Sequence, residues 1–474
     1  MAKRSFEVDS GLSPNQVLAR DAAGFGRAAL SGTCAHAGTI QARLLAGKEP
    51  KLDWRDLAPS AGGDAPWSGV FDGLPAGGPY TVEARVAAQG AELGRREIKP
   101  VFVGDLWVLA GQSNMQGIGN LDARMERPHK LVSCYALRES WERASEPLHP
   151  LIESPDSCHW SCAPEDRPRL IEEARRTRTK GAGLGLAFAK ELVKRIGVPI
   201  GLIPCAHGGT SMQQWSPERR HEGGASLYGS MLRRVAAAGG RVKGVLWYQG
   251  ESECGPEAAP RFVERFTNLI ACIREDLGAP ELPFLYVQIA RFVHRNANAE
   301  CWNRVREAQL RCEGLVPHAA MVGAIDLPLD DAIHISTDGL KRLGKRLADA
   351  ACRVVYGANE LRAGPRLKAA RFMNAERTRL KLSFAGVHGK LVSPRRVGGF
   401  SACDAEGAPM LLIFDSYVDP DDPNAVVLKL EPVPPPGAKL YYGAGADSFC
   451  TLLDERDHAA PAFGPLALDD VPVG

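Results

Sequence analysis

The chain has 474 residues, of which 45% are hydrophobic and 24% are charged, and its formal net charge is +2. These values are typical of a globular protein, and the length predicts about three domains. The small net charge gives no electrostatic reason to expect nucleic-acid or membrane-surface binding. No apolar run approaches the roughly 20 residues that cross a bilayer.

The N-terminus and the cysteines bear on the cellular compartment. Residues 1–9 lack the apolar core of a secretory signal, so we expect a cytoplasmic protein unless a leader has been removed, in which case it is periplasmic or secreted. Most of the 12 cysteines lie inside apolar segments and are predicted to be buried thiols. For the cluster at 158–162 (Cys-His-Trp-Ser-Cys) we favour a structural role over a metal site, because no second cluster supplies further ligands.

Residues 1–100 are predicted to form a small β-sandwich. Short runs of alternating polarity, such as 39–44 and 80–86, are separated by clusters of Gly, Pro and Asp. These are strand and turn signals, and no long helical pattern interrupts them. We therefore expect an accessory β-domain ahead of the rest of the chain.

Residues 101–357 alternate between strand and helix patterns. Five apolar runs are predicted to be strands: 106–110, 200–205, 244–248, 284–289 and 320–325. Runs this apolar are typical of strands buried on both faces, which indicates a parallel sheet flanked by helices. Ligands of such sheets bind at the carboxyl ends of the strands.

Two helices are predicted inside this region. Apolar residues at 184, 188, 192 and 196 share one helical face, and Gly197 and Pro199 end the helix. A similar pattern runs over 338–355. Residues 358–474 then return to β signals, with runs at 380–384, 410–414, 426–430 and 439–442. The expected order is thus β, α/β, β.

Four polar sets follow strands of the central region. They are 111–115 (Gly-Gln-Ser-Asn-Met), 205–211 (Cys-Ala-His-Gly-Gly-Thr-Ser), 247–253 (Trp-Tyr-Gln-Gly-Glu-Ser-Glu) and 330–334 (Asp-Asp-Ala-Ile-His). Each alone has an ordinary explanation: a serine after a strand is usually a helix cap, and paired glycines are usually a turn. Four sets at the ligand-binding edge of one sheet favour catalysis.

Ser113 is the candidate nucleophile of this constellation. It lies where backbone N–H groups are unpaired and can face a developing oxyanion. Asp331 and His334 are three residues apart, so one turn can bring the carboxylate beside the imidazole, which then acts as the base for Ser113. The N–H groups of Ser113 and of Gly208 or Gly209, with the side-chain amide of Gln249, are predicted to form the oxyanion hole.

The four sets resemble the sialate O-acetylesterase branch of the SGNH hydrolases, which also includes esterases acting on acetylated xylan. The motifs span about half of the chain. The flanking β-rich segments also look similar to those of large bacterial members. The resemblance implies a flavodoxin-like three-layer sandwich with a parallel sheet, and a deacetylation that uses no metal or other cofactor. Where the wider superfamily has an asparagine in the third set, this chain has Gln249.

Further side chains are candidates for support or substrate contact. Gln112, Asn114, His207 and Glu251 belong to the motifs, and Glu251 is expected to brace its loop by hydrogen bonds. Trp215 can either stack on a sugar face or lie in the core. The basic stretch 175–180 can either attract an anionic sugar such as sialate or form a solvated helix end, and we favour the helix end.

Three functions compete at this point. The first is a serine esterase that removes O-acetyl groups from carbohydrates, with an acetylated carbohydrate as its substrate. The second is an acetylxylan esterase, or another short-chain esterase, lipase or thioesterase, with the same triad. The third is a non-catalytic carbohydrate-binding scaffold, against which the intact Ser113, Asp331 and His334 argue.

Overall fold

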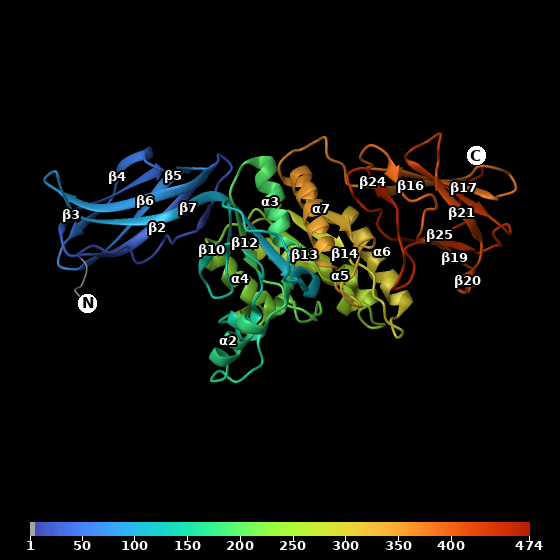
Figure 1. Cartoon of the computed structure of the whole chain (residues 1–474), viewed down its shortest axis with the longest axis horizontal. Helices are drawn as coiled ribbons and strands as arrows, with labels where there is room; N and C mark the ends of the chain where they lie inside the picture. The colour runs from blue at the N-terminus through green and yellow to red at the C-terminus, as the bar shows by residue number, and fades with distance from the viewer. Residues whose placement is uncertain (1–4) are drawn as a thin grey trace.

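The computed structural model describes residues 5–474 and shows an elongated molecule. Figure 1 shows three regions in a row: strands alone at the N-terminal end, strands and helices in the middle, and strands at the C-terminal end. Three separate clusters of buried apolar side chains correspond to these regions. The functional motifs all lie in the middle region.

The N-terminal region consists of mainly antiparallel strands around its own core, and only the short strand β1 runs parallel to its partner β7 among the strands of residues 5–111. β2 pairs with β5, while β3 pairs with β4 and β6, and β6 pairs with β7. Buried and exposed residues alternate along β2, as expected for a strand with one face on a core. The strands are β1 (Val17–Ala19), β2 (Phe25–Cys34), β3 (Ala37–Ala46), β4 (Glu49–Ala61), β5 (Ala65–Pro75), β6 (Gly77–Ala88) and β7 (Ala91–Gly111).

The long strand β7 joins the first two regions. Its first half pairs with β6, and its second half lies between β12 and β13 in the middle of the central sheet. The predicted boundary at residue 100 therefore falls inside one continuous strand. Because β7 is hydrogen-bonded in both regions, the N-terminal strands are held against the central sheet.

The central sheet has the order β10-β9-β12-β7-β13-β14-β15, and all neighbours except β10 and β9 run parallel. Every residue of β12, β13 and β14 is buried, as the continuous apolar runs predicted. The remaining strands of this region are β8 (Gly119–Asn120), β9 (Val132–Tyr135), β10 (Trp141–Arg143), β11 (Lys180–Ala182), β12 (Ile200–Pro204), β13 (Gly244–Tyr248), β14 (Phe284–Gln288) and β15 (Ala319–Gly323).

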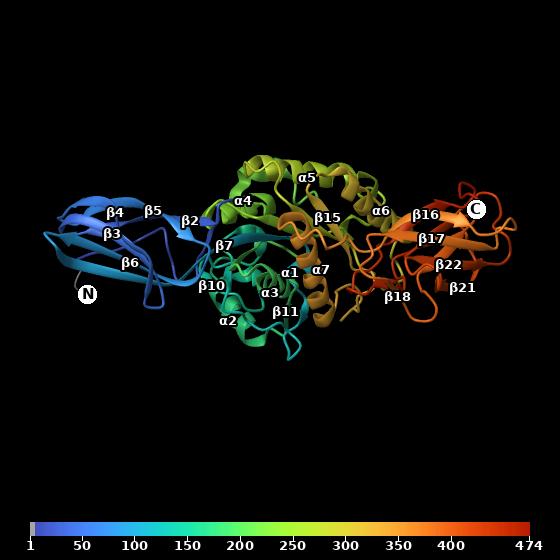
Figure 2. The same cartoon turned by 90° about the horizontal axis from the view of Figure 1, so that it is seen from above.

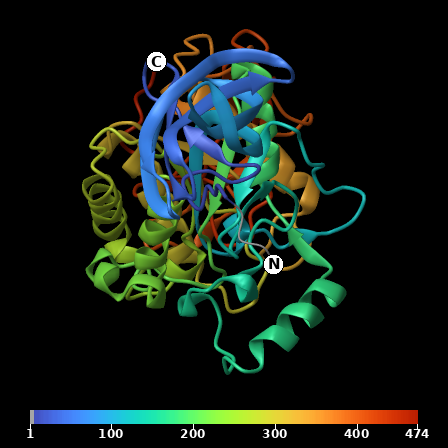
Figure 3. The ribbon, with the colours of Figure 1, turned by 90° about the vertical axis from the view of Figure 1, so that its left-hand side faces the viewer.

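Helices lie on both sides of this sheet, with α4 and α5 on one side and α3 and α7 on the other (Figure 2). Gly344 lets α7 approach α3 closely, because a Cβ at this position would stand 2.5 Å from the carbonyl oxygen of Leu184. The helix α2 stands away from the sheet (Figures 1 and 3). The helices are α1 (Ser113–Gln116), α2 (Arg167–Thr177), α3 (Gly185–Ile196), α4 (Leu227–Ala237), α5 (Phe262–Asp276), α6 (Ala299–Leu315) and α7 (Thr337–Val355). None of the helices within residues 5–474 has the length and apolar character that a bilayer span requires.

The C-terminal region contains two four-stranded sheets, β16-β17-β22-β21 and β20-β19-β23-β25, and the short pair β18-β24. The predicted run 410–414 is wrong as one strand: it is divided between β20 and β21, and Leu411 between them is 99% exposed. The strands are β16 (Arg366–Phe372), β17 (Arg379–Ala385), β18 (Leu391–Val392), β19 (Phe400–Cys403), β20 (Pro409–Met410), β21 (Ile413–Val418), β22 (Ala425–Leu430), β23 (Lys439–Tyr442), β24 (Leu453–Asp454) and β25 (Phe463–Ala467).

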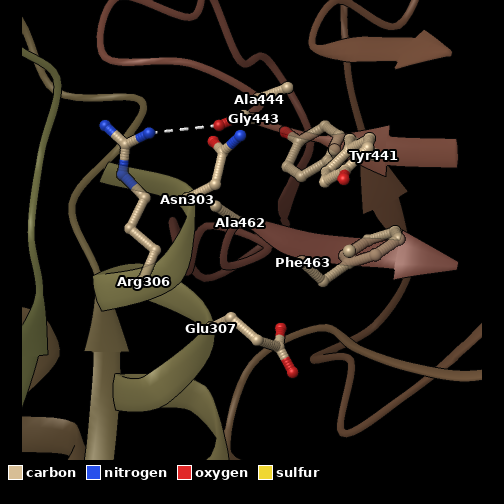
Figure 4. A pocket seen from close by; sticks show the side chains of 10 residues that line it. Asn303, Arg306, Glu307, Tyr441, Gly443, Ala444, Ala462 and Phe463 are labelled. Atoms are coloured by element: carbon tan, nitrogen blue, oxygen red, sulfur yellow. Dashed lines mark hydrogen bonds between the residues drawn. The ribbon is translucent and has the colours of Figure 1, made fainter. Parts of the chain in front are cut away.

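Buried charged side chains attach the C-terminal region to the central helices. Arg306 on α6 donates to the carbonyl oxygen of Gly443 at 3.1 Å (Figure 4). Asp349 on α7 accepts hydrogen bonds from Arg456 Nε at 2.6 Å and from His458 Nε2 at 2.9 Å. Burial acts to raise the pKa of Asp349, but the contacts with His458, Arg456 and Arg195 outweigh it, so the pKa lies well below its usual value.

We expect the substitution Asp349→Asn to lower the free energy of unfolding by about 1–3 kcal/mol, since the buried carboxylate that accepts from Arg456 and His458 loses its charge and one accepting oxygen. The lowered pKa means that this stabilisation is complete above about pH 4, the ordinary carboxyl pKa, and is lost as the pH falls through the folded-state value. Urea unfolding at pH 7 and pH 3 measures both effects, with Asp338→Asn on the exposed side of α7 as control. An equal difference between wild type and variant at the two pH values would contradict this account.

Candidate active site

Ser113 lies at the carboxyl end of β7, where the chain turns into the short helix α1. Gly111 permits this turn, because its φ is +131° and a Cβ would stand 2.2 Å from the carbonyl oxygen of Tyr248. The N–H of Gln112 donates to the same carbonyl at 2.8 Å. Ser113 is 7% exposed, and its N–H is among the first of the helix, which have no intrahelical acceptor.

Asp331 and His334 contact each other in the loop before α7. His334 Nδ1 lies 2.7 Å from Asp331 Oδ2, while Asp331 Oδ1 accepts the N–H groups of Ile333 and His334 at 2.9 and 2.8 Å. Burial acts to raise the pKa of Asp331, but these hydrogen bonds prevail and the pKa is lowered. The ionised carboxylate holds the proton of the imidazole on Nδ1, which leaves Nε2 as an acceptor.

Asn114 connects this loop to the serine turn. Its Oδ1 accepts the N–H of Ile335 at 3.0 Å, and its Nδ2 lies 3.4 Å from the carbonyl oxygen of Ile333. These two residues flank His334 on either side. The residue directly after Ser113 is thus bonded to both neighbours of the histidine, and Asn114 itself is buried.

Glu251 lies on the opposite side of Asn114. Its Oε1 accepts from Asn114 Nδ2 at 2.9 Å, and its Oε2 is buried without a hydrogen-bond partner among the described residues. Burial raises the pKa of Glu251, and the hydrogen bond from Asn114 and the nearby His334 only partly oppose the shift. Gln112 also braces this loop, because its Oε1 accepts the N–H groups of Gly250 and Ser252 at 3.4 and 3.3 Å.

The predicted oxyanion donors differ in their position relative to Ser113 and in the hydrogen bonds that they already make. Gly208 lies beside the serine, since a Cβ on it would stand 3.3 Å from Ser113 Cβ, but its N–H donates to Gln116 Oε1 at 2.8 Å. Gly209 follows in the left-handed conformation and is exposed. Gln249 is fully buried, and its Nε2 donates to Thr210 O at 3.2 Å and to Glu253 Oε1 at 3.3 Å. This arrangement corrects the expected role of Gln249, because its amide is already engaged.

Trp215 is a core residue in this structure and offers no face to a sugar. It is fully buried, donates its Nε1 to Thr210 Oγ1 at 3.0 Å and packs edge-on against Trp247. Of the basic stretch, Arg175 lies near the end of α2 and is paired with Glu153 and Glu172. His207 is half-buried beside His159, with 3.2 Å between the two Nδ1 atoms.

Sequence reasoning missed Gln116 and His159 as neighbours of the site. Gln116 is three residues after the serine and carries no motif signal, while His159 belongs to the cluster that we interpreted as structural. All 12 cysteines, including Cys158 and Cys162, are free thiols. Within residues 5–474, no group of His, Cys, Asp and Glu is arranged to hold a metal ion.

Comparison with known proteins shows which family the central region resembles. Residues 103–353 match the model of the carbohydrate esterases described as sialic acid-specific acetylesterases. A probable carbohydrate esterase from Arabidopsis thaliana is 33% identical over 273 residues, which cover 53% of this chain and 91% of that protein. Sialate O-acetylesterase from Homo sapiens is 24% identical over 67% of this chain, and the match spans 63% of the human protein.

A similar fold occurs in a solved structure. The crystal structure of a carbohydrate acetylesterase from Xanthomonas citri superimposes with a TM-score of 0.66 at 22% sequence identity. The superposition covers 96% of this chain and 98% of that one. The likeness therefore extends beyond the central region to the strands on both sides of it.

Proposed function

Because the chain belongs to the sialic acid-specific acetylesterase family of carbohydrate esterases, and is therefore a carboxylic ester hydrolase, we propose that it removes O-acetyl groups from carbohydrates with the triad Ser113, His334 and Asp331. The observation that supports this triad best is the set of Asn114 bonds. They connect the residue after Ser113 to both neighbours of His334. The hydrogen bond from His334 Nδ1 to Asp331 connects the proposed base to its orienting carboxylate.

The proposed reaction has two halves. His334 Nε2 takes the proton of Ser113 Oγ, which attacks the acetyl carbonyl and forms a tetrahedral intermediate. When the intermediate collapses, the ester bond breaks and the sugar oxygen leaves with the proton from His334. Water, deprotonated by the same imidazole, then attacks the acetyl-serine, and acetate and free Ser113 result. Asp331 keeps the tautomer of His334 and stabilises the imidazolium.

The oxyanion of each intermediate is proposed to face the N–H of Ser113 at the start of α1 and the N–H of Gly209. The N–H of Gly208 joins them when the side chain of Gln116 releases it. Gln249 is not retained in this role. Its engaged amide instead fixes the relative position of Thr210 and Glu253.

We further propose a division of the chain into a β-domain (1–100), a catalytic domain of the flavodoxin-like SGNH type with a three-layer arrangement (101–357) and a C-terminal β-domain (358–474). The three separate apolar cores support this division. The substrate is an O-acetylated carbohydrate, with sialate or xylan as the alternatives for its sugar. Another short-chain esterase, a lipase or a thioesterase with the same triad, and a non-catalytic carbohydrate-binding scaffold, are the competing functions.

The variant Ser113→Ala is expected to lose at least about 10³-fold in kcat because the nucleophile is absent. Released acetate is measured on acetylated xylan, acetylated pectin and acetylated sialosides, and p-nitrophenyl acetate is compared with longer p-nitrophenyl esters. Circular dichroism checks the fold, and Ser401→Ala on an exposed strand is the control. Wild-type turnover by Ser113→Ala would reject the triad, and preference for long acyl esters would favour the competing enzyme.

Replacement of Asp331 by Asn is expected to lower kcat by about 10⁴-fold while the loop stays folded. The amide can keep accepting the backbone N–H groups through its oxygen, but its NH₂ then faces His334 and forces the proton onto Nε2. Steady-state kinetics on p-nitrophenyl acetate measures the loss. The exposed Asp166→Asn at the start of α2 is the control. A loss below tenfold would remove Asp331 from the triad.

Substitution of Asn114 by Ala is expected to lower kcat by about 10²-fold, since the histidine loop is then no longer fixed relative to Ser113. The unfolding midpoint in urea reports any loss of stability separately from the loss of kcat. Asn296→Ala, an exposed position in the loop before α6, provides the matched control. An unchanged kcat would mean that these bonds do not position the base.

A further inference from the structure

Two imidazoles contact each other next to the proposed nucleophile. His207 follows β12, and His159 ends a 3₁₀ helix formed by Ser157–His159. Their rings are stacked with centroids 5.4 Å apart, and their Nδ1 atoms are 3.2 Å apart. At this distance one Nδ1 must carry a hydrogen and the other must accept it, so the tautomers of the two rings depend on each other.

The buried carboxylate of Asp156 determines which of the two rings donates the hydrogen bond between the Nδ1 atoms. Asp156 Oδ2 accepts from Arg233 Nη2 at 2.7 Å and from Ser230 Oγ at 2.6 Å. Burial acts to raise the pKa of Asp156, but these partners outweigh it and the pKa is lowered, so the group is a carboxylate that can only accept. The single hydrogen of the Ser230 hydroxyl is therefore committed to Asp156.

The tautomers of both histidines follow from this commitment. His159 Nε2 lies 3.4 Å from Ser230 Oγ, which has only lone pairs left to offer, so His159 Nε2 carries the hydrogen. Burial lowers the pKa of His159 to about 3 and also lowers that of His207, partly opposed in His207 by the Cys158 carbonyl, so both rings are neutral at pH 7. His159 Nδ1 is then the acceptor, His207 Nδ1 is the donor, and His207 Nε2 is left with a lone pair.

The Nε2 atom of His207 is available to a ligand. Among residues 5–474 the side-chain hydrogen bond of the His207 ring runs through Nδ1, and Nε2 is not among the buried polar atoms that lack a partner. The carbonyl oxygen of Cys158 can accept only from the ring N–H, which the tautomer of His207 places on Nδ1. The backbone places residue His207 beside the serine turn: the N–H of His207 donates to the carbonyl oxygen of Gly111 at 3.0 Å. The next residue, Gly208, lies against Ser113.

We infer that His207 Nε2 accepts a hydrogen bond from a free hydroxyl of the sugar, next to the ester that Ser113 attacks. This inference rests on the proposed function and adds a substrate class to it. A neutral acceptor recognises a hydroxyl and rejects a group that cannot donate, such as a second acetyl ester. The preferred substrates are therefore partially acetylated sugars with a free hydroxyl beside the scissile ester. Asp156, Ser230 and His159 are positioning residues, because they act on the substrate only through His207.

The test uses the O-acetylated methyl glycoside that the wild-type enzyme hydrolyses fastest, together with its mono-deoxy analogues, each of which lacks one free hydroxyl. One analogue is expected to show about a tenfold lower kcat/KM in wild type, which corresponds to one lost hydrogen bond. In His207→Ala this difference between parent and analogue is expected to vanish. His36→Ala, in the distant N-terminal region, keeps the wild-type difference.

The outcomes separate this inference from the proposed function. If no deoxy analogue is slower in wild type, or if the difference persists in His207→Ala, the inference is overturned while the acetylesterase function stands. If wild type hydrolyses p-nitrophenyl acetate but no acetylated glycoside, the proposed substrate class and the inference fall together.

The relay itself is tested by NMR on protein labelled with ¹⁵N-histidine at pH 7. Long-range ¹H–¹⁵N spectra are expected to show the Nε2–H tautomer for His159 and the Nδ1–H tautomer for His207, and the reverse assignment overturns the inference. In Ser230→Ala the His207 ring is expected to become a mixture of tautomers and the tenfold discrimination to fall several-fold. Ser230→Thr, which keeps the hydroxyl, is expected to restore both readouts.

Discussion

The side-chain amide of Asn114 is the contact on which the arrangement of the site depends. It bonds the turn after β7 to Ile333 and Ile335 on one side and to Glu251 on the other. An amide has one accepting and one donating end, so it can bind a backbone N–H, a backbone carbonyl and a carboxyl group at once. Three segments that are far apart in the sequence are thereby fixed around Ser113 in a buried place where each unmade bond would be costly.

The hydrogen bonds of Asn114 can position these segments because the strand that carries the serine turn is itself fixed on both sides. β7 lies between β12 and β13 and continues into the N-terminal strands, so the serine turn is supported by both regions. On the other side, α7 starts directly after the histidine loop and is bonded through Asp349 to Arg456 and His458 of the C-terminal region. The flanking strands therefore stabilise the two elements that carry the proposed nucleophile and base, although neither flank contributes a triad residue.

The sequence predicted β12, β13, β14 and β15 within one or two residues, because their apolar runs are continuous. For β7 it predicted only the end of the strand, and it missed the short strands β9 and β10. It also predicted the contact between Asp331 and His334, which are one turn apart. It failed where the outcome depends on residues from distant segments. Gln249 has the right chemistry for an oxyanion donor, but Thr210 and Glu253 already occupy its amide. Trp215 has the right surface for a sugar, but it is buried against Trp247 of β13, which is distant in the sequence.

His334 and His207 are both proposed to act through Nε2, His334 as the base for Ser113 and His207 as an acceptor for a sugar hydroxyl. The way in which a carboxylate contacts each ring explains the difference. Asp331 touches the ring of His334 directly, so a positive charge that develops on this ring in the reaction is stabilised at 2.7 Å. Asp156 reaches His207 only through the neutral side chains of Ser230 and His159. Such a chain fixes a tautomer but gives a charged ring little stabilisation, and burial disfavours the charge further. Direct contact thus suits a ring that must take a proton, whereas the relay suits a ring that must remain neutral and only accept a hydrogen bond.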